Sequence, residues 1–447
     1  LFRVSHFIFF VNISYFKYKK TIGVNWFAKV QTIADWQRIY HIVYLPTAGE
    51  PIEVLRATIQ SLCASAYPLN KMIVVLGGEA RLESDFLPKA EQIKKEFAEK
   101  FFRLLITVHP DGLVGEMKGK GANANWMGHR SQEMIDELKI PYDDLIVSYF
   151  DSDTCVHKQY FSYLAYLYLT NPNPTRASYQ PAVLYNNNIW DAPAAMRVTA
   201  FGTIFWLLTE LIRPERMYTF SSHSMSFRAL VDVGFWEKTI VTDDSRIFLQ
   251  CFFRYNGDYR VLPMYIPVSM DTVKDKSYWK SFKNLYKQQR RWAWGVEHFP
   301  YMMENFRNNK MIPWYKKIKY TWNLVEGMYS WATAPILIFI LGRLPLYVAG
   351  HGNDSSSVIV QNAPFVLEWL MTFAMAGIFV SAIISMLLLP QRPAHYNKWK
   401  YAVMLLQWIL LPVTLILFGS LPAIDAQTRL MLGKKYHLGF FITPKIR

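Results

Sequence analysis

The chain has 447 residues, of which 52% are hydrophobic and 16% aromatic, and its formal net charge is +15. This length allows a soluble domain of roughly 250 to 280 residues together with membrane segments. Basic residues cluster beside apolar stretches, as in membrane proteins, and none of them forms a stripe in a recognisable nucleic-acid module, so we expect no nucleic-acid partner. The three cysteines are isolated and odd in number, which favours a reduced cytosolic domain.

The N-terminal stretch, residues 1–20, combines apolar side chains up to Phe16 with a basic cluster at Lys17, Lys19 and Lys20. Its apolar part is shorter than the ~20 residues that a membrane-spanning helix needs. No small-residue cleavage site follows, so a cleaved signal peptide fits poorly. We therefore predict a partial transmembrane segment, the tail of a span that begins earlier, or an interfacial segment.

Residues 37–275 alternate between short β-branched runs and stretches whose apolar residues have helical spacing. This alternation is typical of an α/β domain with a doubly wound, mainly parallel, Rossmann-like sheet. Ligands of such sheets bind at the carboxyl ends of the strands. The predicted strands are 41–45, 71–76, 103–108 and 145–150, and the predicted helices are 51–66 and 89–102.

Two carboxylates, Asp151 and Asp153, lie at the exit of the predicted strand 145–150. At this spacing, carboxylate oxygens can hold a hard divalent cation, Mg or Mn, and leave coordination positions for phosphate oxygens. The metal would neutralise charge on a departing nucleoside diphosphate. A strand-end turn with two solvated carboxylates is the alternative for these residues alone.

Thr242-Asp243-Asp244 offers a second acidic group. The carboxylate of Asp244 could take a proton from an acceptor hydroxyl, as in general-base catalysis. The alternative is a helix N-cap, in which Thr242 or Asp243 caps the apolar stretch that follows. The two interpretations are compatible, because a cap would fix the loop that presents Asp244.

Residues 276–319 are predicted to form amphipathic helices at the membrane interface, and they contain Gln288-x-x-Arg291-Trp292. The planar guanidinium of Arg291 suits a pyrophosphate, and the indole of Trp292 can stack on a sugar face. Aromatic residues in this stretch could instead serve only as interfacial anchors.

A Gly-rich basic segment, Lys118 to Asn125, precedes these motifs and could approach a diphosphate closely. It lacks the spacing of a Walker loop. A solvated turn is an equally good interpretation of these residues alone.

Residues 320–425 are predicted to form transmembrane helices, with spans at 328–348, 365–389 and 401–421. A buried helical bundle in a soluble protein is the alternative. The loop 350–364 lacks Lys and Arg, as an outer loop should, whereas the loop 392–400 is basic, as an inner loop should be.

The basic tail, residues 426–447, conflicts with three single crossings, because it would then lie outside. Either one segment is re-entrant or an interfacial helix has been counted as a span. The charges that create the conflict are Arg429, Lys434, Lys435, Lys445 and Arg447.

Taken in order and followed by membrane helices, these motifs resemble the family 2 glycosyltransferases, especially the cellulose-synthase-like and hyaluronan-synthase-like members. The resemblance covers residues 38–294 as a GT-A domain. It implies nucleotide-sugar contacts at Thr47 and Glu50 in the Pro-Thr-x-x-Glu-like turn, at Lys120, and at Gln288 and Arg291. It also implies metal ligands at Asp151 and Asp153, a general base at Asp244, and acceptor contacts at Asp243 and Trp292.

The resemblance further implies an inverting enzyme of the plasma (inner) membrane with a cytoplasmic catalytic domain. Such an enzyme would transfer a sugar from a nucleotide sugar, with a UDP-sugar as the expected donor, to a growing polysaccharide, processively and coupled to export. A non-processive enzyme that adds one sugar to a lipid, and a catalytically inactive scaffold subunit, are the alternatives.

Two departures from the family pattern bear on specificity. The family has an Asp after the second strand, where this chain has Glu79 as a substitute, so the pattern leaves the nucleotide open. The family's acceptor segment has no clear match in the stretch 220–226, so the acceptor need not be cellulose.

Overall fold

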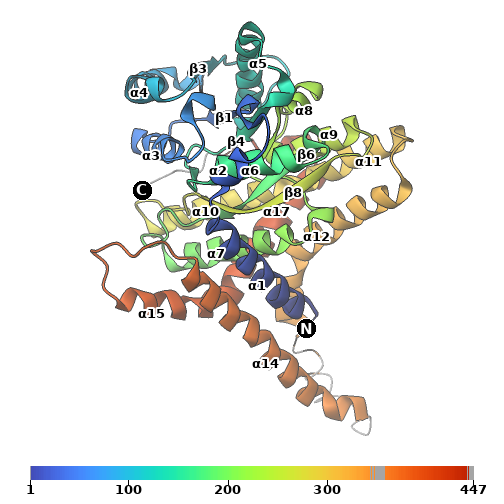
Figure 1. Cartoon of the computed structure of the whole chain (residues 1–447). Coiled ribbons are helices and arrows are strands. Elements are labelled where there is room, and N and C mark those ends of the chain that lie inside the picture. Colours follow the sequence, from blue (N-terminus) through green and yellow to red (C-terminus); the bar gives the residue numbers. More distant parts are fainter. Residues whose placement is uncertain (1, 343, 345–346, 348–357, 440, 442–447) are drawn as a thin grey trace.

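The computed structural model describes residues 2–342, 344, 347, 358–439 and 441 (Figure 1). Within these residues a single eight-stranded sheet carries helices on both sides, and apolar helices extend away from it. The strands are β1 (Tyr40–Pro46), β2 (Met72–Glu79), β3 (Arg103–His109), β4 (Leu145–Tyr149), β5 (Cys155–Val156), β6 (Ala177–Leu184), β7 (Ser224–Ser226) and β8 (Arg260–Ser269).

The strand order is β3-β2-β1-β4-β7-β6-β8-β5. The pairs among β3, β2, β1 and β4 are parallel, β7 runs antiparallel to both of its neighbours, and β6 pairs with β8 in parallel. The predicted fold class, a mainly parallel α/β sheet beside a helical region, is confirmed. The four strands expected from the sequence are its parallel half.

Strands β6 and β8 were not predicted, and prolines explain why. Pro181 interrupts β6 at a register shift, and Pro263 and Pro267 lie within β8. Proline supplies no N–H to a strand ladder, so a run that contains it does not read as a strand in the sequence. The mixed half of the sheet was therefore missed.

The helices of the domain lie close to their predicted positions, with one shift. The helix expected at 89–102 is α4 (Glu83–Phe97), whose acidic first turn suits the positive end of the helix dipole. The Gly-rich segment, rather than forming a turn, begins a helix, α5 (Lys120–Leu138). The remaining helices up to the sheet's last strand are α1 (Phe2–Ile22), α2 (Trp26–Gln31), α3 (Ile52–Cys63), α6 (Tyr160–Thr170), α7 (Ala194–Leu211), α8 (Phe227–Asp232) and α9 (Asp243–Arg254).

After β8 the described residues are helical. The elements are α10 (Tyr278–Ala293), the short 3₁₀ turn η8 (Trp294–Glu297), α11 (His298–Asn308), α12 (Trp314–Leu341), α14 (Val358–Leu387), α15 (Trp399–Leu406), η9 (Gln407–Leu410), α16 (Leu411–Thr414), the π-helical η10 (Leu415–Ser420), α17 (Leu421–Met431) and η11 (Lys434–Tyr436). Figure 1 shows α14 pointing away from the sheet, while α17 lies next to α10.

By length and composition, four helical segments among the described residues could cross a membrane: Ala194–Leu211, Trp314–Leu341, Pro364–Leu387 and Trp399–Met431. Three of them correspond to the predicted spans, and the fourth, α7, was not predicted. Only 11% of the apolar window of α12 and 25% of that of α14 is buried. Apolar side chains that face outward to this extent argue against a soluble bundle and are typical of membrane helices.

The predicted outer loop 350–364 lies outside the described residues up to position 357, as do Leu1, Lys445 and Arg447. The N-terminal helix α1 is described from Phe2. It packs against α7, β8 and α14.

Candidate active site

A cleft with about 790 Å³ of open space lies at the carboxyl ends of the parallel strands. It collects residues from the turn after β1, from α5, from the exit of β4, and from α9 and α10. Eight of the ten predicted site residues line it: Thr47, Glu50, Lys120, Asp151, Asp244, Gln288, Arg291 and Trp292. The other two, Asp153 and Asp243, lie behind its wall.

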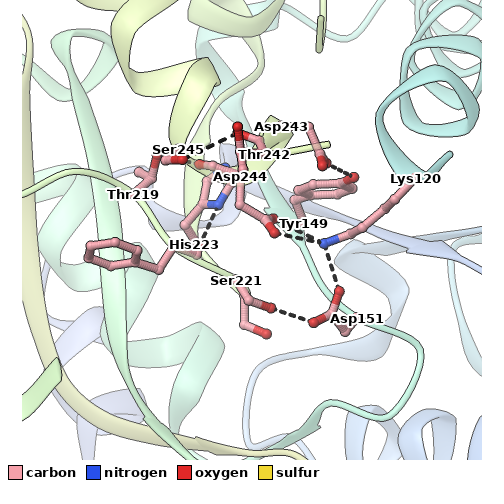
Figure 2. A network of polar contacts seen from close by, with 12 residues as sticks. Lys120, Tyr149, Asp151, Thr219, Ser221, His223, Thr242, Asp243, Asp244 and Ser245 are labelled. Carbon is pink, nitrogen blue, oxygen red and sulfur yellow. Dashed lines mark hydrogen bonds and ion pairs between the residues drawn. The ribbon is translucent and has the colours of Figure 1, made fainter. Parts of the chain in front are cut away.

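At the centre of the cleft, the ammonium group of Lys120 joins two carboxylates. Its Nζ lies 2.7 Å from Oδ1 of Asp151 and 3.0 Å from Oδ1 of Asp244 (Figure 2). The same Nζ lies 4.1 Å from the ring centroid of Tyr149, within the range of a cation–π contact. Side chains more than 90 residues apart in the chain thus meet at one cation.

The pKa of Lys120 reflects this pairing. Burial acts to lower it, but the carboxylates of Asp151 and Asp244 outweigh burial and raise the pKa above its usual value. The ammonium group therefore stays charged at neutral pH.

Asp243 lies next to this cluster and is almost fully buried. The hydroxyl of Tyr149 donates a hydrogen bond to its Oδ2 at 2.5 Å. Burial first, and then the charge of Asp244, raise the pKa of Asp243. Asp244 therefore presents its carboxylate to the cleft, and Asp243 anchors the start of α9 against β4.

The two acidic residues of the Asp-x-Asp pair face different surroundings. Asp151 lines the cleft and accepts a hydrogen bond from Oγ of Ser221 at 2.6 Å. Asp153 is fully buried, and its Oδ2 accepts the backbone N–H of Asp271 at 2.9 Å. Asp271 follows β8 and itself lines the cleft. Asp153 thus holds the backbone at Asp271, a further acidic residue of the cleft wall.

The donor set of the cleft suits a hard divalent cation. Magnesium is typically held by one or two protein carboxylates together with substrate phosphates, and the residues that line the cleft include the carboxylates of Asp151 and Asp271. The ammonium of Lys120 already places a positive charge against Asp151. Among the described residues, no three His, Cys, Asp or Glu side chains gather as a complete protein cage, so phosphate oxygens would have to complete the coordination.

The turn after β1 forms another part of the wall. Thr47 donates from its backbone N–H and its hydroxyl to the carbonyl of Gly77, at 2.7 and 3.1 Å. Glu50 accepts the N–H of Ala48 at 2.6 Å, across Gly49 with its left-handed φ of +87°. These bonds hold a tight turn that presents Thr47 and Glu50 to the cleft.

Helix α10 supplies the opposite wall through Gln288, Arg291 and Trp292. The indole of Trp292 packs on Tyr185, with ring centroids 5.8 Å apart. The adjacent Arg290 pairs with Asp425 of α17 at 2.8 Å, which ties this wall to the apolar helical region. The cleft is therefore built partly from the sheet and partly from α10, which is bound to the apolar helical region.

Several lining residues were not predicted from the sequence, among them Ser221, Asp271 and Phe441. Asp271 carries the same signal as Asp151, an acidic residue after a strand, but the prolines of β8 hid the strand. Phe441 comes from the C-terminal tail, and the ammonium of Lys287 lies 4.5 Å from its ring centroid. No local pattern in the sequence indicated that the tail returns to the cleft.

The two departures from the family pattern both lie at the cleft. Glu79 ends β2, forms an ion pair with Arg81, and lines both this cleft and an adjacent cavity of about 340 Å³. In the stretch 220–226, Ser221 contacts Asp151, and burial lowers the pKa of His223 to about 4. His223 is therefore neutral at physiological pH.

Comparison with known proteins gives one family match. The model of glycosyl transferase family group 2 matches residues 146–423. No curated protein matches the sequence. Among solved structures, a mannosyltransferase from Pyrobaculum calidifontis, PcManGT, in complex with GDP-Man and Mn²⁺, is 14% identical, with 85% of this chain and 99% of that chain covered and a TM-score of 0.45. S. aureus TarS 1–349 in complex with UDP-GlcNAc is 10% identical, with 77% and 90% covered and a TM-score of 0.41.

Proposed function

The chain belongs to glycosyl transferase family group 2, and we propose that it is a membrane-embedded inverting glycosyltransferase that transfers a sugar from a nucleoside diphosphate-sugar. We take the donor to be a UDP-sugar and the acceptor to be a growing polysaccharide. The observation that carries the proposal is the meeting of Asp151, Lys120 and Asp244 in one cleft whose opposite wall is formed by Arg291 and Trp292.

In the proposed reaction, the acceptor hydroxyl attacks the anomeric carbon as the bond from that carbon to the diphosphate oxygen breaks. The hydroxyl proton passes to the carboxylate of Asp244, and the anomeric configuration inverts. The cations of Lys120 and Arg291 lie in the cleft where they can hold the diphosphate as its charge grows. Thr47, Glu50 and Gln288 line the same cleft and are proposed to position the nucleotide.

A divalent cation, Mg or Mn, is part of the proposal. Asp151 and Asp271 are the residues that would hold it, and Asp153 would orient Asp271 through its backbone N–H. When bound, such a cation neutralises charge on the leaving diphosphate.

The acceptor is assigned to the side of the cleft that carries aromatic rings. Trp292 and Tyr185 offer a broad surface against which a sugar ring can stack. Asp243, buried beneath Asp244, would support the acceptor site through its contact with Tyr149 rather than touch the sugar.

A panel of nucleotide sugars, incubated with the membrane-embedded protein with and without Mn²⁺, tests the activity through release of the nucleoside diphosphate. Diphosphate release from one donor, dependent on the metal, is expected. Product length then separates the alternatives. Radiolabelled product that is long and not extractable into organic solvent supports polymerisation, whereas only short, lipid-extractable product would show single addition to a lipid.

We further propose that the α/β domain lies on the cytoplasmic face of the plasma membrane. Two of the basic clusters beside the apolar helices contact that domain: Lys17 donates to the hydroxyl of Tyr265, and Lys316 donates to the carbonyl of Gly257. Basic residues beside spans favour the cytoplasmic side.

The last apolar segment, residues 399–431, is proposed to lie in the plane of the membrane rather than to cross it. Contacts with α7 and α10 recur along the segment. In chain order, Gln407 pairs with Arg197, Phe418 with Phe282, and Asp425 with Arg290. Just before the segment, Tyr396 donates to Asp191. The outer face of the segment carries exposed apolar residues such as Leu406 and Ile409, which suits the lipid of one leaflet. This arrangement removes the charge conflict of the basic tail.

A further inference from the structure

A largely buried polar cluster lies beside the cleft and joins the start of α9 to the turn after α10. It consists of Thr242, Ser245 and Arg246 from one side, and of Glu297 and His298 from the other. None of these side chains lines the cleft. The first three lie within two residues of Asp244, and the other two follow Trp292 by five and six residues.

The carboxylate of Glu297 bridges the two sequence motifs. One oxygen accepts the hydroxyl hydrogen bond of Thr242, the residue directly before Asp243 and Asp244. The other accepts the indole N–H of Trp294 at 3.1 Å, two residues after Trp292. A single side chain therefore holds the first residue of one motif against a residue just after the other.

The neighbouring His298 fixes the same residue from a second direction. Nε of Arg246 can only donate, so Nδ1 of His298 accepts its hydrogen bond at 3.2 Å. The proton of the neutral ring then lies on Nε2, which donates to Oγ of Ser245 at 2.7 Å. The Ser245 hydroxyl in turn donates to the carbonyl of Thr242 at 3.2 Å.

The direction of these hydrogen bonds decides whether the cluster contains an activated nucleophile or only holds Thr242 in place. With Nε2 protonated, His298 cannot take a proton from Ser245, so the pair does not form an activated nucleophile. Burial lowers the pKa of His298 well below its usual value, which keeps the ring neutral. The cluster is therefore a clamp on Thr242, through its carbonyl and its hydroxyl together.

We propose that Glu297 is a positioning residue that sets the orientation of Asp244 relative to Trp292. This inference rests on the proposed function, in which Asp244 is the base and Trp292 contacts the acceptor. Thr242 would normally cap α9 with its hydroxyl, yet that hydroxyl is spent on Glu297 and makes no cap hydrogen bond. The helix start is thus held by the neighbouring element rather than by its own cap.

The first test needs no substrate. Glu297→Met keeps roughly the length of the side chain but removes both acceptor oxygens, so it can accept a hydrogen bond from neither Thr242 nor Trp294. Amide hydrogen exchange measured by mass spectrometry on the full chain in lipid should rise in two separate peptides, residues 242–246 and 292–297. Glu304→Met, at an exposed position of α11, is the matched control and should leave both peptides unchanged.

The second test uses the diphosphate-release assay with whichever nucleotide sugar proves active. Glu297→Met should lower kcat by about 10-fold or more, because a misplaced base loses near-attack geometry. KM for the nucleotide sugar should stay within about threefold, since its proposed contacts lie mainly on other elements. Thr242→Ser, which keeps the hydroxyl, should retain kcat, while Thr242→Val should lose as much as Glu297→Met.

Faster exchange only in residues 292–297, with residues 242–246 unchanged, would overturn the coupling. Equal losses of kcat in Thr242→Ser and Thr242→Val would also overturn it, because the hydroxyl would then be irrelevant. Should the wild-type chain turn over no nucleotide sugar, the proposed function fails while the exchange experiment still decides the clamp.

Discussion

Nζ of Lys120 lies 3.0 Å from Oδ1 of Asp244, so the carboxylate proposed as the base is already paired with an internal cation. A diphosphate entering the cleft would compete for that ammonium group and release the carboxylate to the acceptor. The pairing thus links donor binding to the availability of the base.

Replacement of this lysine by glutamine tests the pairing. Lys120→Gln leaves Asp151 and Asp244 facing the cleft without their common counter-charge. We expect a lower thermal unfolding temperature and a larger gain in that temperature on adding Mn²⁺ than the wild type shows. Differential scanning fluorimetry with and without Mn²⁺ measures both effects.

Affinity for the donor should fall in the same variant. Loss of one charge-assisted contact to a diphosphate is expected to weaken binding by about 10-fold or more. The charge-matched control is Lys139→Gln, at the far end of α5. An unchanged affinity in Lys120→Gln would place the diphosphate away from this residue.

Asp243 should make stability depend on pH. Its carboxyl has a raised pKa in the folded protein, so the folded chain binds this proton at pH values where the unfolded chain, with an ordinary value of about 4, has released it. The sign follows: as pH rises from 5 to 8, deprotonation costs folding free energy. Asp243→Asn removes this cost and can still accept from Tyr149.

We therefore expect the difference in unfolding temperature, Asp243→Asn minus wild type, to grow as the pH rises from 5 to 8. The underlying effect is limited to about 1.4 kcal/mol per pH unit. A difference that stays constant, or that shrinks as pH rises, would show that Asp243 is ionised in the folded state throughout this range.

The in-plane placement of residues 399–431 makes a prediction about sidedness. In a background with Cys63, Cys155 and Cys251 replaced by serine, single cysteines at Asn397 and Lys434 should react with a membrane-impermeant maleimide from the same side as one at Glu133 in α5. A cysteine at Asn362, near the start of α14, should react from the other side. Labelling of positions 397 and 434 from opposite sides would show that the segment crosses.

Much of the site could be predicted because parallel strands end at one edge of a sheet. Asp151 follows β4, and that rule alone directs it to the ligand side. Asp244 and Trp292 follow from their motifs, and both line the same cleft. Periodicity and motif spacing were sufficient for these residues.

Other features depend on long-range contacts that the sequence pattern does not reveal. The inward turn of Asp153 is set by the backbone of Asp271, which lies 118 positions further along the chain. Prolines concealed β6 and β8, and with them the acidic residue at the exit of β8. The proposed in-plane course of the last apolar segment rests on its contacts with α7 and α10, which the sequence does not show.

The role of Asp244 is the central claim, and Asp244→Asn tests it most directly. Diphosphate release from the active nucleotide sugar should fall by about 10²-fold or more, as expected for loss of a general base. Binding of the nucleoside diphosphate with Mn²⁺, measured by isothermal titration calorimetry, should remain. Full activity in Asp244→Asn with folding preserved would contradict the account and favour a scaffold role for the chain.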